Sequence, residues 1–331
     1  MPNADREPHK VAVVALEGAL ASTVTGPLDI FGQAGVLWNH ISETTPRPWF
    51  QVGLVSPSGG PVTCQGGLRL IPHGGLDAAH DADLVIISAG SLERLGAEHR
   101  ELIPWLRERH AAGASLASVC VGAFFLAETG LLDGRVATTH WAYAGLFRGR
   151  YPAVDLRPER LVTDAGSLFC SGGVSAYVEL CLYLVERTAG FEAAHQAAQA
   201  LVLAEGRDSQ TPYAIFDFQK RHADREILAV QTWLEDNHAG RVVVEDLAPR
   251  FGMSPRNLKR RFKRATGDTP LAYLQRCRVE SAKRALMAGR QGVEEVSAQV
   301  GYEDTAFFRR VFKRHTGQTP AAFRRKYQAR G

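Results

Sequence analysis

One cysteine occupies a position where a thiol could take part in chemistry. Cys120 follows the apolar run SLASV and precedes VGAFFLAETG, so it lies where a predicted buried strand turns into a helix. The positive end of the helix dipole lowers the pKa of a thiol in that position. Gly122 leaves room for a sharp turn, as in a nucleophile elbow, and His140 in ATTHW could complete a Cys/His pair. The competing interpretation is a packing cysteine, because free cysteines are among the most buried residues.

A second group of side chains has the chemistry of DNA recognition. Four cations recur at positions i, i+3, i+4 and i+7 of a predicted helix, so they share one exposed face. They are Arg256, Lys259, Arg260 and Lys263. Arginine suits bidentate contacts with guanine edges, and lysine suits contacts with phosphates. The competing interpretation is an ordinary solvated helix face.

The elements that must position this stripe occur twice, as VEDLAPRFGMSPRNLKRRFKRATGDTPLAY and as VEEVSAQVGYEDTAFFRRVFKRHTGQTPAAF. Gly252 precedes Gly301 by 49 positions, whereas Phe262 precedes Phe312 by 50, so the second copy has one additional residue in its turn. Each copy predicts a helix, a glycine turn and a basic helix, which is the arrangement of a helix-turn-helix. The repetition favours DNA binding over a solvated face.

Local signals define both basic helices. Ser254 and Asp304 are the predicted N-caps, and Pro255 suits the first helical position. The buried faces are expected to carry Leu258, Phe262, Phe308 and Phe312. Between the copies, PLAYLQRCRVESAKRALMAG predicts a long amphipathic helix that sets their separation. Recognition helices in successive major grooves would lie about 34 Å apart.

The two copies are not expected to read the same bases with the same strength. The second stripe consists of Ala306, Arg309, Arg310 and Lys313. Arg256 thus corresponds to Ala306, which removes one base-reading side chain. Pro249 falls inside the first predicted helix, where an interior proline costs ~3 kcal/mol. We therefore expect that helix to begin late, near Asp246, and the first motif to be the weaker reader.

Charge divides the chain into two regions. Residues from Asp224 onward hold 22 Lys and Arg against 12 Asp and Glu, whereas the remainder holds 17 against 23. An acidic body joined to a basic C-terminal region is typical of a nucleic-acid-binding protein. Charge alone leaves a membrane surface or an acidic protein as partners.

Composition limits the other classes of function. Hydrophobic residues make up 45% of the 331 residues, which favours two folded domains. The polar start MPNADREPHK followed by VAVVAL indicates a first strand and no secretion signal. VSAYVELCLYLV is interrupted by Glu179 and is too short to span a bilayer. Five cysteines without CxxC spacing fit a reducing cytoplasm, and we expect no metal and no cofactor.

Strand and helix patterns alternate over residues 11–205, which predicts an α/β domain with a largely parallel sheet. The predicted strands include VAVVAL, FQVGLVSP, LVIISAG, SLASVC, RVATTHW and RLVTDAG. We assign residues 1–205 to this domain, 206–226 to a linker and 227–331 to an all-α DNA-binding domain. The two helix-turn-helix motifs are expected at about 244–265 and 293–315.

The C-terminal region, from about Ile227 to Tyr327, resembles the AraC/XylS family of bacterial transcription regulators. GYEDTAFFRRVFKRHTGQTPAAFRR is very similar to the second motif of that family. The resemblance implies two helix-turn-helix units joined by a central helix. With the stripes above, it implies DNA contacts at Arg256, Asn257, Lys259, Arg260, Lys263, Thr305, Ala306, Arg309, Arg310 and Lys313.

The N-terminal region resembles the PfpI-type branch of the class I glutamine-amidotransferase-like superfamily, which implies a flavodoxin-like fold. VTGPLDIF, SAGS, ASVCVGAFFLAETGLLDGRVATTHW and SGGVSAYVEL carry the likeness. It implies that Cys120 is the elbow cysteine, that Gly90 and Ser91 belong to a backbone-amide loop, and that His140 lies near the thiol.

This chain departs from the superfamily at two positions. Hydratase and chaperone-like members carry an acidic residue where this chain has Thr23, and protease-like members carry a histidine where it has Val121. The nearest upstream carboxylate, Glu17, belongs near the strand end. General acid–base assistance is therefore missing, and we interpret the pocket as a ligand sensor and the protein as no enzyme. The expected ligand-binding residues are Thr23, Gly90, Ser91, Cys120, Val121 and His140.

Together the two regions are similar to the GlxA family of transcriptional regulators. That resemblance implies a cytoplasmic, nucleoid-associated protein that binds double-stranded promoter DNA and a small-molecule effector and controls a metabolic operon. It also implies dimerisation through the N-terminal domain, and we expect RNA polymerase as a further partner and no membrane contact. Two alternatives stay open: a cysteine hydratase or amidase with a DNA-binding appendage, and a redox sensor that uses Cys120.

Overall fold

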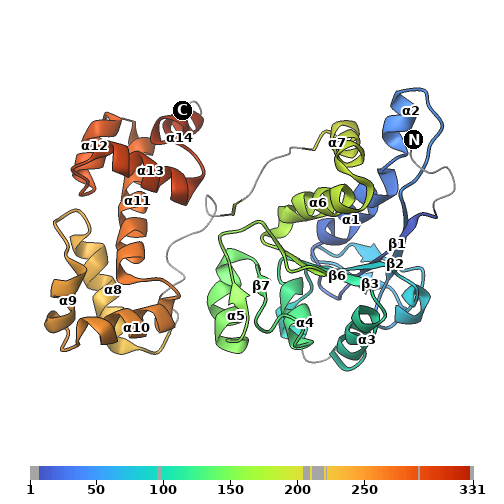
Figure 1. The fold of residues 1–331 in the computed structure, drawn as a ribbon, viewed down its shortest axis with the longest axis horizontal. Coiled ribbons are helices and arrows are strands. Elements are labelled where there is room, and N and C mark those ends of the chain that lie inside the picture. The colour runs from blue at the N-terminus through green and yellow to red at the C-terminus, as the bar shows by residue number, and fades with distance from the viewer. Residues whose placement is uncertain are drawn as a thin grey trace. The chain divides into compact units, whose positions relative to one another are not determined.

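The computed structural model describes residues 7–94, 99–203, 209–210, 220, 222–289 and 291–328. The chain forms two compact units, Met1–Gln210 and Thr211–Gly331 (Figure 1). Most of the predicted linker at 206–226 lies outside the described residues, so its bounds stay a prediction. Among the described residues, no helix is long and apolar enough to cross a membrane.

A six-stranded sheet forms the centre of the N-terminal unit. Its strands follow the order β2-β1-β5-β6-β10-β9. The pairs from β2 to β10 are parallel, whereas β10 and β9 are antiparallel. This confirms the predicted α/β fold with its largely parallel sheet. The strands are β1 (His9–Val14), β2 (Phe50–Val55), β5 (Leu84–Ile87), β6 (Ser115–Val119), β9 (Val162–Asp164) and β10 (Leu168–Ser171).

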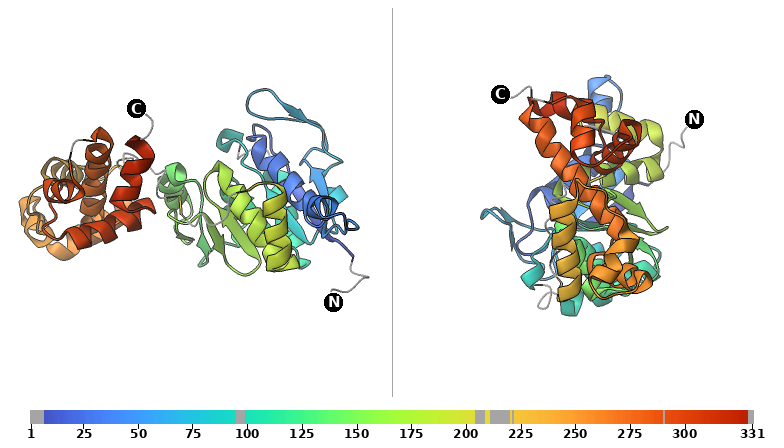
Figure 2. Two further views of the ribbon diagram at one scale, coloured as in Figure 1. Left: turned by 90° about the horizontal axis from the view of Figure 1, so that it is seen from above. Right: turned by 90° about the vertical axis from the view of Figure 1, so that its left-hand side faces the viewer.

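The central strands are apolar along their length because helices cover both faces of the sheet. Every residue of β5 and β10 is buried. Helices α1 and α6 pack together over one face, and α3 and α4 pack together over the other (Figure 1). Figure 2 shows these layers from two further sides. The helices are α1 (Ser22–Gln33), α2 (Leu37–Ile41), α3 (His99–Ala111), α4 (Gly122–Glu128), α5 (Ala144–Arg150), α6 (Tyr177–Ala189) and α7 (Phe191–Ala200).

Among the described residues of this unit, two small sheets and four short 3-10 helices lie outside the main sheet and its helices. The predicted strand RVATTHW is shorter than expected, because only Val136–Ala137 form β7, which pairs with β8 (Asp155–Leu156) outside the main sheet. The residues after β7 instead turn toward Cys120, whose carbonyl accepts a hydrogen bond from Thr139. The other elements are β3 (Val62–Thr63), β4 (Arg69–Leu70), η1 (Leu76–Ala79), η2 (Leu92–Arg94), η3 (Trp141–Tyr143) and η4 (Val174–Ala176).

The C-terminal unit is helical throughout its described elements, as predicted. Its helices are α8 (Arg225–Asn237), α9 (Val244–Arg250), α10 (Pro255–Thr266), α11 (Pro270–Ala288), α12 (Val293–Gln299), α13 (Thr305–Thr316) and α14 (Pro320–Gln328). The offset between α9 and α12 is one residue smaller than the offset between α10 and α13. The additional residue therefore lies in the second turn, which confirms the prediction.

Two separate hydrophobic cores hold this unit together, and α11 contributes to both. Tyr273, Leu274 and Cys277 in its first half pack with α8, α9 and α10. Val279, Ala282 and Leu286 in its second half pack with α12, α13 and α14. The predicted central helix is thus confirmed, and it is the structural connection between the two motifs (Figure 1).

The first helix of the first motif does not begin late. It begins at Val244 and contains Pro249 in its last turn, so the prediction of a start near Asp246 was wrong. The helix ends directly after the proline, where the amide of Phe251 donates to Ala248 O and that of Gly252 donates to Pro249 O. The proline is accommodated because α9 is short, so that only the hydrogen bond to Glu245 O is lost, and because Leu247 and Ala248 are anchored in the core.

Candidate functional site

Cys120 lies in a strained turn between β6 and α4. Its φ of 57° is in the left-handed region, which non-glycine residues rarely adopt. Its amide donates to Ser171 O at 3.0 Å, and its carbonyl accepts from Thr139 Oγ1 at 2.8 Å. A Cβ at Gly122 would lie 2.7 Å from Ile87 O and 2.8 Å from Ser88 O. The predicted elbow is therefore confirmed, and only a glycine fits its third residue.

The thiol of Cys120 is not activated. Burial raises its pKa to about 12, and a hydrogen bond with the amide of Val121 only partly opposes this effect. The prediction of a lowered pKa was wrong, because the side chain is almost fully buried at the start of a short helix, where desolvation outweighs the helix dipole. At neutral pH this cysteine is a protonated thiol.

His140 lies on the loop next to the elbow but supplies no charge to it. Burial lowers the pKa of its imidazole, so the ring is neutral at physiological pH. Its Nδ1 accepts the amide hydrogen of Ala142 at 3.1 Å. A Cβ at Gly173 would lie 3.6 Å from the His140 ring, an ordinary contact distance, so the turn after β10 lies directly beside the imidazole. His140 is connected to Cys120 through Thr139, which favours a binding loop over a thiolate–imidazolium pair.

The remaining predicted ligand residues meet at the same edge of the sheet. Thr23 is fully buried, donates to Leu20 O at 2.7 Å and accepts from the amide of Ala89 at 3.2 Å. The amides of Gly90 and Ser91 donate to Ser88 O and Glu17 O at 3.0 and 3.3 Å. These amides are therefore already paired within the protein and do not form a ready oxyanion site.

Glu17 does not replace the missing acid. Its carboxylate accepts the amide hydrogen of Thr63 at 3.0 Å, and Gly18 donates to Thr63 O at 2.9 Å. These contacts connect the loop after β1 to β3. The position near the strand end is as predicted, and it leaves the elbow without a carboxylate partner in this part of the described structure.

Cys120 should react slowly with electrophiles. With a pKa of about 12, its thiolate fraction at pH 8 is roughly 1000-fold smaller than that of free cysteine. We expect iodoacetamide to alkylate Cys120 at least ~100-fold more slowly than free cysteine at pH 8. Peptide mass spectrometry measures the rate, and the urea-unfolded chain, in which Cys120 should react normally, is the control. A native rate within tenfold of free cysteine would contradict a buried, unactivated thiol.

Gln210 is a residue that no sequence pattern marks. It is the last residue of the N-terminal unit, and its side chain is buried. Its Nε2 donates to Thr139 O at 2.8 Å, to Arg160 O at 3.2 Å and to Thr138 Oγ1 at 3.3 Å, while its Oε1 accepts from the Trp141 amide at 3.2 Å. Thr139 thus contacts both the Cys120 elbow and the point where the chain leaves this unit.

The basic stripe of the first motif is positioned as predicted. The Ser254 hydroxyl caps α10 by accepting from the amide of Asn257, and Gly252 has a φ of 65° in the turn. Leu258 and Phe262 are fully buried. Asn257 is half-buried, and its Oδ1 accepts from Arg260 at 3.0 Å. The exposed cations are Arg256, Lys259, Arg260 and Lys263.

The second motif repeats this arrangement. Asp304 caps α13 by accepting from the amides of Ala306 and Phe307, and Phe308 and Phe312 are fully buried. The guanidinium of Arg310 lies over the Phe307 ring, 5.6 Å from its centroid. Thr305 is half-buried, and the exposed stripe is Ala306, Arg309, Arg310 and Lys313. The scaffold of both stripes is confirmed, whereas the DNA contacts themselves stay predictions.

Arg278 on α11 connects the loop before the first motif to the turn of the second motif, and sequence patterns gave no sign of this role. Its side chain donates to His238 O at 2.8 Å and Gly240 O at 2.9 Å, both in the loop after α8. The same guanidinium lies 5.0 Å from the ring centroid of Tyr302, in the turn of the second motif. Arg278 therefore holds the loop after α8 and the second turn together.

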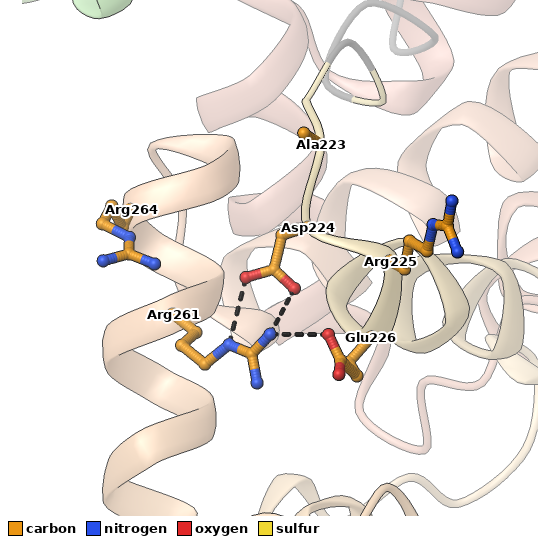
Figure 3. Close-up of a pocket in the computed structure, with 6 residues that line it drawn as sticks. All are labelled: Ala223, Asp224, Arg225, Glu226, Arg261 and Arg264. Carbon is orange, nitrogen blue, oxygen red and sulfur yellow. Dashed lines mark hydrogen bonds and ion pairs between the residues drawn. The ribbon is translucent and has the colours of Figure 1, made fainter.

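An acidic cluster anchors the start of α8 to α10 (Figure 3). Arg261 donates to Asp224 Oδ1 and Oδ2 at 2.6 and 3.0 Å and to Glu226 Oε2 at 2.7 Å. Arg225 and Arg264 flank these side chains around an open cavity of about 500 Å³. Arg261 corresponds to the buried Val311 of the second motif, so the first motif uses ion pairs where the second uses apolar packing.

The two units and their sites define a DNA-binding transcription regulator with an N-terminal unit of enzyme-like α/β fold. The chain belongs to the DJ-1/PfpI family, whose model matches residues 9–187, more than half of the chain. A model described as helix-turn-helix domain matches residues 247–326. The helix-turn-helix domain is of the AraC type, and the chain combines it with the DJ-1/PfpI domain as the GlxA-type regulators do.

Relatives of known name agree with this assignment. The regulator CdhR of Pseudomonas aeruginosa is 29% identical over 276 residues, covering 81% of this chain and 80% of that protein. The regulator GlxA of Rhizobium meliloti is 29% identical over 302 residues, covering 88% and 92%. An isonitrile hydratase of Pseudomonas putida is 29% identical over 208 residues, covering 60% and 83%. A crystal structure assigned as a transcriptional regulator of Vibrio parahaemolyticus has a TM-score of 0.52 at 25% identity, covering 59% of this chain and 100% of that chain.

Proposed function

We propose that this regulator is controlled by a small metabolite that binds at the carboxyl edge of the sheet, near Cys120 and His140. The observation that carries the proposal is an intact elbow whose thiol is protonated, with no charged partner among the described residues. Such a site keeps the backbone elbow of an enzyme without its acid–base chemistry. Binding is the function that this geometry supports best.

The hydrogen bonds around Gln210 support a route from this pocket to the DNA-binding unit. Cys120, Thr139 and Gln210 form a continuous chain of contacts, both of 2.8 Å. The residue after Gln210 is the first of the C-terminal unit. A ligand that moves the Thr139 loop would therefore act on the covalent connection between the units. For this to regulate, the ligand must bind two arrangements with different affinity.

We further propose that α10 and α13 read DNA through their exposed stripes, in the cytoplasm and as part of a homodimer formed by the N-terminal units. The second stripe lacks the cation that Arg256 supplies to the first, so the two helices read different bases. In the same proposal, the DNA-bound protein controls a metabolic operon and has RNA polymerase as a further partner.

Arg310 is the side chain whose loss tests base reading most directly. Arg310→Ala should weaken binding to a duplex selected from a random-sequence pool by about 1–3 kcal/mol and relax the preference at one base position. Repeating the selection with the variant measures that preference. Binding of both proteins should also fall steeply with salt, because many phosphates are neutralised. An equal loss for every sequence would show a phosphate contact instead.

A thermal-shift screen of amines, amino acids and nitrogen-rich metabolites tests the ligand proposal. A bound ligand raises the melting temperature by mass action. The same compound should then change the affinity for the selected duplex in the wild-type chain. A compound that binds but leaves DNA affinity unchanged would overturn the regulatory role.

The two alternatives predict different results for Cys120→Ser and for oxidation. If turnover of an added compound vanishes in this variant while DNA binding persists, the protein is an enzyme. If peroxide changes DNA affinity in the wild type and not in the variant, it is a redox sensor. The ligand proposal expects neither result, since the thiol is buried and protonated.

A further inference from the structure

Each recognition helix carries a cation that is paired with a glutamate of the preceding helix. Lys259 Nζ lies 3.0 Å from Glu245 Oε1, and Arg309 Nη2 lies 2.6 Å from Glu294 Oε1. Both glutamates are the second residue of their helix, and both cations are the fifth residue of theirs. The pair occurs at the same place in both motifs.

The glutamate is identical in the two copies, whereas the turn and the cation differ. The second turn has one additional residue, and lysine is replaced by arginine, yet the ion pair is conserved between the two motifs. All four side chains are more than half exposed, at 54% and 60% in the first pair and 54% and 68% in the second. Exposed ion pairs contribute little to folding, so stability does not explain why both motifs keep the pair.

Both cations belong to the stripes that face DNA in the proposed function. A free lysine or arginine there would bind any phosphate and release a counterion, whatever the sequence. A carboxylate beside the cation offsets its charge and restrains its side chain. The cation then gains less from phosphates, and its contacts with base edges account for a larger share of the binding.

We propose that Glu245 and Glu294 are positioning residues for base recognition, which act by restraining Lys259 and Arg309 and by suppressing their sequence-independent phosphate contacts. The proposal rests on the proposed DNA contacts of α10 and α13, and it adds an acidic residue of the first helix to the specificity of each motif. It is independent of any ligand in the N-terminal unit.

The test uses the full chain with Glu245→Gln and, separately, Glu294→Gln. Binding is measured to poly(dI–dC) and to a duplex selected by the wild-type chain from a random-sequence pool. Each variant should bind poly(dI–dC) roughly fivefold to tenfold more tightly at 0.1 M salt, with a salt slope steeper by about 1, as one further phosphate contact predicts. Affinity for the selected duplex should change by less than about twofold, so the specificity ratio falls.

A matched control separates positioning from a general change of charge. Asp246 is the neighbouring carboxylate on α9, is exposed, and forms no ion pair with the described residues. Asp246→Asn removes the same charge and should leave the specificity ratio within about twofold of wild type. An equal fall of the ratio in this control, or an unchanged ratio in both glutamate variants, would overturn the proposal.

A double-mutant cycle shows whether the glutamate acts through the cation. In a Lys259→Ala background, Glu245→Gln should have no further effect on either DNA, because its partner is gone. An undiminished effect would mean that the glutamate acts on DNA directly. If Lys259→Ala and Arg309→Ala each leave binding to both DNAs unchanged, the proposed contacts of these cations fail, and the positioning role fails with them.

Discussion

Gly122→Ala is expected to lower the free energy of unfolding of the N-terminal unit by about 3 kcal/mol, the upper end of what overpacking of a core costs. The new Cβ would lie 2.7 Å from Ile87 O and 2.8 Å from Ser88 O, and both are backbone atoms of β5 and its end. Neither carbonyl can rotate away as a side chain would. The variant must move α4 away from the sheet or distort the elbow at Cys120.

Urea denaturation followed by tryptophan fluorescence measures this loss, because four of the five tryptophans lie in the N-terminal unit. Gly145→Ala is the matched control: Gly145 lies in helix α5, and nothing is within 4 Å of its added Cβ. That variant should be neutral or more stable, by up to about 1 kcal/mol. Equal midpoints for the two variants would show that the elbow adjusts at no cost.

Gln210→Leu is expected to cost the N-terminal unit about 2–4 kcal/mol, because the buried hydrogen bonds of its two amide N–H groups and its carbonyl oxygen, of about 1 kcal/mol each, are lost at similar side-chain volume. These hydrogen bonds connect Gln210 to Arg160 and to the loop of Thr138, Thr139 and Trp141, which contacts Cys120. The same denaturation measures the loss. Ser209→Ala removes the hydroxyl that a half-buried neighbour donates to Glu159 O, and it should cost less, about 1 kcal/mol.

The Gln210 variant also tests the proposed route between the units. A compound that stabilises the wild type should still raise the melting temperature of Gln210→Leu, but it should no longer change DNA affinity. Ser209→Ala should retain both responses. If the Gln210 variant keeps the full change in DNA affinity, the signal does not pass through this residue.

Local patterns predicted the elements of this chain well. The strands of the parallel sheet follow from buried apolar runs, and the two recognition helices follow from caps, turn glycines and helical spacing. RVATTHW was the exception, since its residues after Ala137 bind the elbow through Thr139 and leave the sheet. Pro249 was misjudged because a residue close to the helix end breaks few hydrogen bonds, whatever its propensity.

The candidate sites were predictable only in part. Residue type and spacing identified Cys120 and both basic stripes, because these depend on neighbours in sequence. The pKa of Cys120 depends on how much protein surrounds the thiol. The helix dipole follows from the local sequence, but the burial of the thiol depends on the whole fold. Gln210, Arg278 and the glutamates paired with Lys259 and Arg309 act across long sequence separations, so no local pattern could indicate them.

Because α11 belongs to both cores of the C-terminal unit, its length fixes the orientation of the second motif relative to the first. One residue inserted between Cys277 and Val279 would rotate α13 by about 100° and shift it by about 1.5 Å relative to α10. In the proposed function, substitutions on the exposed stripes alter the bases that are read and leave this phase intact. Single insertions in α11 would instead break the angular register of the two proposed DNA contacts at once, so the length of this helix would be a fixed parameter of the operator.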